Sequence, residues 1–395
     1  MTLPALILKK NEDRRLRAGH LWVFSNEVDT AKSPLKGFEP GDLVEIQTSN
    51  GQVIGTGYVN PNSLISARIL SRDPRHPVDR SLLVHRLNVA LALRERLYPR
   101  PYYRLVFGES DGLPGLTVDR YGQVLVAQIT TAGMEKMKAD VVAVLEKVIK
   151  PAAILLRNDT GIRELEGLPL YTETALGTVP DAIEVEEHGL KFQVPLAAGQ
   201  KTGWFFDQYA NRARLLPYVQ GQRVLDVCSY VGAWGVQAAA RGATGVTCVD
   251  SSGAALEWAG RNAAANGVQL TLKDADAFDA LKELREAGEK FGVVVLDPPA
   301  FVKRRKDLAA GSEAYRRLNQ LAMQVLERDG MLISCSCSHH MPGEDLLAGI
   351  QSAARHLGRD AQVLERGMQA PDHPVHPAIP ETAYLKAFYV RVVTP

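Results

Sequence analysis

The C-terminal half of the sequence holds two thiols and a carboxylic acid whose setting suits covalent catalysis. Cys335 and Cys337 end the β-rich run ISCSCS, and Asp297 ends the run VVVLD. A thiolate that adds to C6 of a cytosine makes the neighbouring C5 nucleophilic, which divides one difficult step into two. A protonated Asp297 near N3 would stabilise the charge that builds on the ring. These residue types therefore predict substitution at a pyrimidine carbon.

The motif Asp297-Pro298-Pro299-Ala300-Phe301 also predicts contacts to a base. Pro298 and Pro299 lack N–H donors and fix the backbone, which leaves carbonyl oxygens free to accept hydrogen bonds from an exocyclic amine. Phe301 can stack on a flipped base. The alternative interpretation is a rigid turn after a buried strand.

Free cysteines at strand ends are most often small buried hydrophobic residues, and we assign Cys228 and Cys248 to that class. The chain has four cysteines in 395 residues and no C-x-x-C pair, so reduced thiols are expected. A zinc site is disfavoured, because four ligands within six residues rarely close a tetrahedron. Its ligands would be Cys335, Cys337, His339 and His340.

Three acids follow successive β-rich runs and favour a nucleoside-containing cofactor. The run VLDVCSYVGAWG carries Asp226 and Gly232, and residues 228–230, Cys-Ser-Tyr, replace the glycines of a dinucleotide fingerprint, which argues against NAD. Asp250 in TCVDSS is placed to bind the hydroxyls of a ribose, and Asp276 in LKDADAF to bind an adenine amino group. Each acid alone could instead be a helix N-cap.

Alternating strand and helix patterns surround these residues and predict an α/β fold with a parallel, doubly wound sheet. Such sheets bind ligands at the carboxyl ends of their strands, where the acids and thiols lie. The expected strands are 223–227, 244–250, 270–274, 291–297 and 330–336. The expected helices are 234–241, 255–266, 280–288, 313–328 and 344–357.

Two further domains are predicted before this one. Residues 1–75 form a β-rich module with a hairpin turn at 49–51, and the Pro- and charge-rich stretch 73–79 marks its end. Residues 76–183 form a middle α+β domain that opens with an amphipathic helix near 80–96, and residues 184–395 form the doubly wound domain.

The formal net charge is only +1, so any affinity for nucleic acid must come from local patches. One patch is the run Lys303-Arg304-Arg305-Lys306, which could also lower the pKa of a nearby thiol. The other comprises Lys9, Lys10, Arg14, Arg15 and Arg17. No apolar run reaches the ~18 residues that span a bilayer, and no signal cleavage site is evident, so we expect a cytoplasmic protein with no membrane partner.

The order Asp226, Gly232, Asp250, Asp276 and LDPPAF resembles class I S-adenosylmethionine methyltransferases over the last ~200 residues. With GQKTGWFFDQYANR, the SCSCS stretch and DHPVHPAIPETAYLKAFYVRV, the whole chain resembles bacterial large-subunit ribosomal RNA cytosine-5 methyltransferases that carry an N-terminal PUA domain. The resemblance implies S-adenosylmethionine as cofactor, large-subunit ribosomal RNA as partner and a homodimer as one oligomeric state. It also implies that Cys337, inside S-C-S, is the nucleophile.

The resemblance extends the candidate site beyond the catalytic pair Cys337 and Asp297. For the cofactor it implies Lys201, Thr202, Gly203, Asp226, Tyr230, Gly232, Asp250, Ser251 and Asp276. For the RNA it implies Asp207, Gln208, Pro298, Pro299, Phe301, Lys303, Arg304 and Arg305. Unaided, the sequence around 201–212 indicates only a polar turn that leads to a capped helix start.

Two departures from related patterns affect the mechanism. Cys335 adds a second thiol two residues before Cys337, and Pro298-Pro299 stands where another branch of RNA cytosine-5 enzymes has Pro-Cys, so one thiol must both attack and be released. Rival functions are methylation of an exocyclic amino group, which needs no thiol, and a ribosome assembly factor that binds S-adenosylmethionine without turnover. A nicotinamide-dependent oxidoreductase ranks last.

Overall fold

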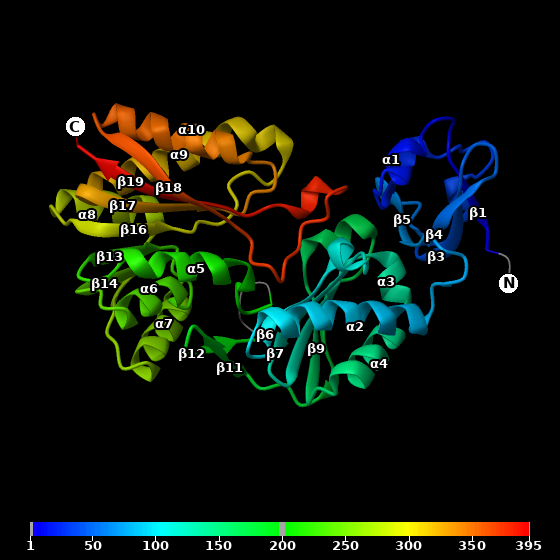
Figure 1. Ribbon diagram of the computed structural model, residues 1–395, viewed down its shortest axis with the longest axis horizontal. Coiled ribbons are helices and arrows are strands. Elements are labelled where there is room, and N and C mark those ends of the chain that lie inside the picture. The colour runs from blue at the N-terminus through cyan, green and yellow to red at the C-terminus, as the bar shows by residue number, and fades with distance from the viewer. Residues whose placement is uncertain (1–2, 197–201, 395) are drawn as a thin grey trace. The chain divides into compact units, whose positions relative to one another are not determined.

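The computed structural model describes residues 3–196 and 202–394 and divides into two compact units, each considered by itself (Figure 1). The first unit comprises Met1–Asp181, Leu196–Trp204 and Pro371–Thr382. The second comprises Ala182–Pro195, Phe205–Ala370 and Ala383–Pro395. Two short segments of the stretch 184–395 therefore belong to the first unit. None of the helices in the described residues is long and apolar enough to cross a membrane.

A five-stranded sheet forms the N-terminal part of the first unit, in the order β1-β3-β4-β5-β2. Its interior is a cluster of aliphatic side chains that includes Leu6, Val44 and Ile69. The turn predicted at 49–51 joins β3 to β4, with Gly51 in the left-handed region at φ 85°. The elements are β1 (Ala5–Ile7), α1 (Arg14–Arg17), β2 (Trp22–Phe24), β3 (Asp42–Gln47), β4 (Val53–Val59) and β5 (Ile65–Ser71).

Residues 72–79 contain no helix or strand and lead into a second five-stranded sheet, ordered β10-β9-β8-β7-β6. Helix α2 packs against α4 through Leu83, Leu87 and Val144. The elements are α2 (Arg80–Leu97), β6 (Tyr102–Phe107), β7 (Leu116–Tyr121), β8 (Val124–Ile129), α3 (Ala132–Lys136), α4 (Lys138–Ile149), β9 (Ala153–Asn158) and β10 (Tyr171–Gly177).

The second unit is built on a seven-stranded sheet in the order β15-β14-β13-β16-β17-β19-β18, preceded by a hairpin of β11 and β12. Strands β13 to β17 are parallel, as predicted. The strands are β11 (Ala182–Glu187), β12 (Leu190–Pro195), β13 (Arg223–Val227), β14 (Gly245–Asp250), β15 (Thr271–Asp274), β16 (Phe291–Leu296), β17 (Leu326–Ser336), β18 (Asp360–Met368) and β19 (Lys386–Val393).

Helices cover both faces of this sheet and form two separate cores. Val224 and Val295 face a core with α5, α6 and α7, whereas Leu225 and Val294 face a core with α8, α9 and α10. Figure 1 shows α9 and α10 on the face opposite α6 and α7. The helices are α5 (Tyr209–Leu215), α6 (Ala233–Ala240), α7 (Gly253–Ala265), α8 (Ala277–Glu286), α9 (Leu308–Val325) and α10 (Gly343–His356). Because both faces are buried, the strands have nearly continuous apolar sequences.

Two predicted details of this sheet are wrong. The helix expected to run to residue 328 ends at Val325, because Leu326 takes extended backbone angles and pairs with Phe291 as the start of β17. The sheet is also not wholly parallel, since β19 runs antiparallel to both β17 and β18. Strands β18 and β19 were not among the strands predicted from the sequence.

Candidate active site

The carboxyl ends of the parallel strands bring the predicted chemical groups to one edge of the second unit's sheet. Strand order reverses between β13 and β16: the chain proceeds from β13 to β14 and β15 on one side and from β16 to β17 on the other. Ligands bind at such a switch point in doubly wound sheets. Asp226 lies at the end of β13, Asp297 follows β16 and Cys337 follows β17.

The two neighbouring thiols have different environments. Strand β17 ends at Ser336, between them. Cys335 is fully buried in the core, and burial raises the pKa of its thiol well above the usual value. Cys337 is partly exposed, and its Sγ lies 4.0 Å from the carbonyl oxygen of Pro298. Only Cys337 is therefore placed both to meet a ligand and to contact the Asp297–Phe301 motif.

A buried tyrosine fixes the two serines that flank Cys337. The hydroxyl of Tyr315, on α9, lies 2.9 Å from the Oγ of Ser336 and 2.9 Å from the Oγ of Ser338. The backbone N–H of Val302 also donates to Ser338 Oγ, at 3.1 Å. The S-C-S triplet is therefore held from both sides, and one of these bonds connects it to the segment that follows Phe301.

A partly buried lysine lies beside the same triplet. Lys386, at the start of β19, is the register partner of Ser336, and its Nζ donates to the carbonyl oxygens of Ser338 at 2.6 Å and Tyr384 at 2.8 Å. Burial lowers the pKa of Lys386 to about 8, and the Cys337 thiolate acts in the opposite direction. Lys386 is thus a cation that interacts with the thiol, and the side chains of the run Lys303–Lys306 are exposed.

Asp297 is held by two side-chain donors. Gln208 Nε2 donates to its Oδ1 at 2.9 Å, and Trp234 Nε1 donates to its Oδ2 at 3.1 Å. Burial raises the pKa of Asp297 above its usual value, and the negative charge of Asp207 adds to this effect. The raised pKa favours a protonated carboxyl group, which can donate a hydrogen bond to a ring nitrogen.

The loop between β13 and α6 has the backbone geometry of a ligand-binding turn. Cys228 and Tyr230 have positive φ angles of 64° and 50°, and Gly232 follows at 81°. A Cβ on Gly232 would lie 2.9 Å from the Cβ of Ala259, so this position requires glycine. Strained non-glycine residues cluster at binding sites.

Asp226 lies beneath this loop and is fully buried. Its Oδ2 accepts the N–H of Gly235 at 3.0 Å, while its Oδ1 has no hydrogen-bond partner in the described residues. Burial is the main cause that raises the pKa of Asp226 to about 8. A buried polar atom without a partner calls for one from a ligand or from water.

The acids that follow β14 and β15 differ in how they are used. Asp250 connects two backbone segments, because its Oδ2 accepts the N–H of Tyr230 at 2.8 Å and its Oδ1 that of Ser252 at 3.0 Å. Asp276 is exposed and caps α8 with its Oδ1, 2.8 Å from the N–H of Phe278. Ser251 is exposed beside Asp250. The N-cap interpretation thus holds for Asp276, and it does not prevent its second oxygen from binding a ligand.

The predicted residues 201–208 fall in three places. Lys201 lies outside the described residues, whereas Thr202 and Gly203 belong to the first unit, where the Thr202 hydroxyl donates to Asp119. Asp207 and Gln208 belong to the second unit. Tyr384 donates its hydroxyl to Asp207 Oδ2 at 2.5 Å.

In the motif that follows β16, Pro298 is buried and Pro299 is exposed. The ring of Phe301 lies 4.8 Å from that of Tyr315 and 6.2 Å from that of Phe278. Lys303 and Arg305 are exposed, and Arg304 pairs with Asp307 at 3.0 Å. No group of three or more His, Cys, Asp or Glu side chains in the described residues is arranged to hold a metal ion.

Sequence reasoning missed the residues that hold the candidate catalytic pair. Tyr315 and Trp234 were included only within helical patterns, and Lys386 and Tyr384 only within the stretch DHPVHPAIPETAYLKAFYVRV. A pattern of burial indicates that a tyrosine or tryptophan is in a core, but not which polar partner its donor reaches.

Comparisons with known proteins agree with this architecture. Residues 6–72 match the PUA-like domain family, and residues 166–391 match the S-adenosylmethionine-dependent methyltransferase family. A protein named ribosomal RNA large subunit methyltransferase I from Salmonella arizonae is 38% identical over 99% of this chain and 98% of its own length. The protein of the same name from Shewanella amazonensis is 39% identical, over 98% of each chain.

Solved structures share the fold across almost the whole chain. A methyltransferase complexed with SAH has a TM-score of 0.85 at 20% identity, and the match covers 98% of this chain and all of the other. An S-adenosylmethionine-dependent methyltransferase from Streptococcus mutans has a TM-score of 0.83 at 19% identity, with the same coverage. The two family matches and the relatives that align over the whole chain show that this protein is an S-adenosylmethionine-dependent methyltransferase. It belongs to the family of ribosomal RNA large subunit methyltransferase I, whose members join a PUA-like domain to the catalytic fold.

Proposed function

We propose that this enzyme methylates C5 of a cytosine in large-subunit ribosomal RNA, with Cys337 as the nucleophile. The observation that carries the proposal is the position of Cys337: a partly exposed thiol, fixed by Tyr315 through its flanking serines, with its Sγ 4.0 Å from the Pro298 carbonyl oxygen. The RNA class comes from the relatives, which are named for it and match the chain end to end. The PUA-like domain would supply RNA contacts outside the site.

The residues at the switch point suit S-adenosylmethionine, the methyl donor of the family. The buried Oδ1 of Asp226, which has no hydrogen-bond partner in the described residues, and the left-handed turn at Gly232 lie beside the N-terminus of α6 and would contact the cofactor. Asp250 and Ser251 would bind the ribose and Asp276 the adenine. The bound cofactor supplies an electrophilic methyl group.

Cys337 would act first, by adding its thiolate to C6 of the cytosine to form an Sγ–C6 bond. Protonated Asp297 would hydrogen-bond N3 and stabilise the charge that reaches the ring, and C5 would then accept the methyl group. Loss of the C5 proton to a base or water and breakage of the Sγ–C6 bond restore the thiolate and leave 5-methylcytosine. Because Pro298 and Pro299 supply no second thiol, Cys337 performs both attack and release.

Lys386 has a supporting role in this proposal. Its ammonium group lies against the carbonyl of Ser338, the residue after Cys337, and interacts with the thiolate. A cation in such a position lowers the pKa of a thiol and raises the fraction of thiolate at neutral pH.

An RNA substrate of this kind would place the enzyme in the cytoplasm. The resemblance also allows a homodimer, which sedimentation of the purified chain would test directly.

The test is covalent trapping on ribosomal RNA that contains 5-fluorocytosine. Fluorine at C5 blocks the proton loss that releases the enzyme, so the adduct should survive a denaturing gel. We expect a band with the wild type and with the control Cys335→Ala, and no band with Cys337→Ala. If the wild type gave no band and Cys337→Ala still transferred methyl groups to the RNA, the reaction would be methylation of an exocyclic amino group. If RNA bound and no methyl group moved, the protein would be a binding factor.

A further inference from the structure

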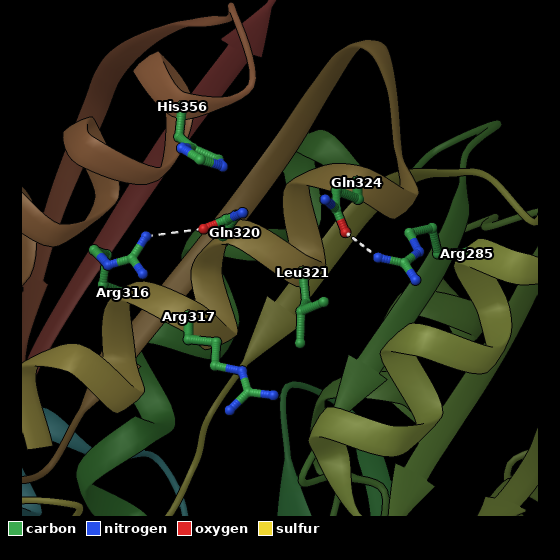
Figure 2. Close-up of a pocket in the computed structure, with 7 residues that line it drawn as sticks. All are labelled: Arg285, Arg316, Arg317, Gln320, Leu321, Gln324 and His356. Atoms are coloured by element: carbon green, nitrogen blue, oxygen red, sulfur yellow. Dashed lines mark hydrogen bonds between the residues drawn. The ribbon is translucent and has the colours of Figure 1, made fainter. Parts of the chain in front are cut away.

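A hollow in the outer helical layer of the second unit is lined by hydrogen-bond donors and by no carboxylate. It has a volume of about 530 Å³ and is formed by side chains of α8, α9 and α10 (Figure 2). Its polar residues are Arg285, Arg316, Arg317, Gln320, Gln324 and His356. Arginine and glutamine are among the side chains that contact phosphate oxygens in protein–nucleic acid complexes.

Two of the arginines are oriented by neighbours. Arg316 makes a two-pronged ion pair with Glu313, at 2.7 and 2.6 Å, and donates to Gln320 Oε1 at 2.8 Å. Arg285 donates to Gln324 Oε1 at 3.2 Å (Figure 2) and pairs with the exposed carboxylate of Glu286 at 3.3 Å. Such contacts reduce the conformational entropy that each long side chain would lose when it binds a ligand.

Arg317 is exposed, and in the described part of the chain it pairs with no carboxylate within salt-bridge distance. Its guanidinium lies 5.6 Å from the ring of Phe278, and that ring lies 6.2 Å from Phe301 in the candidate active site. The exposed run Lys303–Lys306 lies between Phe301 and α9. Ring contacts through Phe278 therefore connect Arg317 of the hollow to Phe301 of the Asp297–Phe301 motif.

We propose that this hollow binds the phosphate backbone of the RNA substrate, at nucleotides that flank the base held by the Asp297–Phe301 motif. The inference rests on the proposed function for the identity of the RNA. The forked donors of arginine match phosphate oxygens. A volume of about 530 Å³ leaves room for more than a single phosphate group. The hollow would therefore position the strand and not read its sequence, since phosphate contacts carry no base information.

The test compares Arg285→Gln, Arg317→Gln and the double variant with Arg355→Gln, an exposed arginine of α10 outside the hollow. Affinity for a large-subunit ribosomal RNA fragment is measured against salt concentration, without cofactor. Each hollow variant should bind about tenfold more weakly. The double variant should lower the slope of log affinity against log salt by about 1 to 2. In methyl transfer the KM for RNA should rise, with kcat and cofactor affinity unchanged.

Several results would overturn the inference. Unchanged RNA affinity and salt slope in the double variant would do so, as would an equal loss with Arg355→Gln, which would indicate only general charge attraction. A loss of binding to inorganic phosphate with intact RNA affinity would indicate a site for small anions instead. Because RNA affinity is measured without turnover, failure of the cytosine-5 mechanism would show in the trapping experiment and not here.

Discussion

Replacement of Lys386 by methionine should shift the pH dependence of the reaction. Methionine keeps most of the length of the side chain and removes its charge. With the pKa of Lys386 lowered to about 8, the ammonium group is still about nine-tenths charged at neutral pH. It lies 2.6 Å from the carbonyl oxygen of Ser338, next to Cys337. A nearby opposite charge shifts the pKa of an ionisable group by ~1–3 units. Because Lys386 is partly exposed, we expect it to lower the pKa of the Cys337 thiol by ~1 unit.

The assay is the single-turnover rate of methyl transfer from about pH 6 to about pH 9. In Lys386→Met the rising, acidic part of the rate–pH curve should move up by about one pH unit. At pH values below the pKa of the thiol, the rate should then be about tenfold lower than in the wild type. Lys386→Arg should keep the wild-type pH dependence, because arginine stays charged. Above about pH 8 the wild type loses its own lysine charge, so its advantage over Lys386→Met should narrow.

Tyr315 and Cys335 also interact with the Cys337 thiol, and burial raises the pKa of both. Both groups stay neutral between about pH 6 and about pH 9, so neither should cause the rise of the rate with pH. Lys386→Met could instead keep the pH dependence of the wild type and be slower by the same factor at every pH. That result would refute the idea that the charge of Lys386 lowers the pKa of the thiol. Lys386 would then act only by holding the backbone of Ser338 and Tyr384.

Two further predictions concern the groups around the reacting pair. Tyr315→Phe removes the hydroxyl shared by Ser336 and Ser338, and it should lower the free energy of unfolding in urea by about 1–3 kcal/mol. The variant should also form less of the covalent RNA adduct. Adduct formation equal to that of the wild type would contradict a positioning role for Tyr315. The native pKa of Asp226, about 8, lies above its usual 3.8, so the native state holds a proton that the unfolded chain releases between these values. This contribution to stability is complete below about pH 4 and declines by about 1.4 kcal/mol per pH unit up to about pH 8. Asp226→Asn should lack the decline, and parallel pH–stability curves for the two proteins would contradict the raised pKa.

The strands and helices of the catalytic fold could be predicted because each has a local signal. Buried strands such as 291–296 are continuous apolar runs, and α10 buries Leu346, Ile350 and Ala353 at helical spacing. Strand β18 has no such signal, because it is an edge strand in which most side chains are exposed, including Val363 and Leu364. The pairing of β19 between β17 and β18 depends on tertiary contacts that no local window contains.

The candidate site shows the same division. Asp297 and Cys337 are visible in the sequence because strand ends carry them, and the ambiguity between Cys335 and Cys337 follows from their shared spacing. Strand β17 ends between the two, at Ser336, a boundary that is beyond the accuracy of a local pattern. Lys386 lies beside the S-C-S triplet because β19 pairs with β17 and aligns Lys386 with Ser336.

The two motifs that indicated the chemistry form a single hydrogen-bonded structure. The segment after Phe301 donates through the N–H of Val302 to Ser338, and Ser338 shares the hydroxyl of Tyr315 with Ser336. The thiol between those serines contacts the Pro298 carbonyl in return. A change in either motif should therefore displace the other, and we expect replacement of either flanking serine to slow the reaction although neither needs to touch the substrate. The reactivity of Cys337 would depend on this connection as much as on the thiol itself.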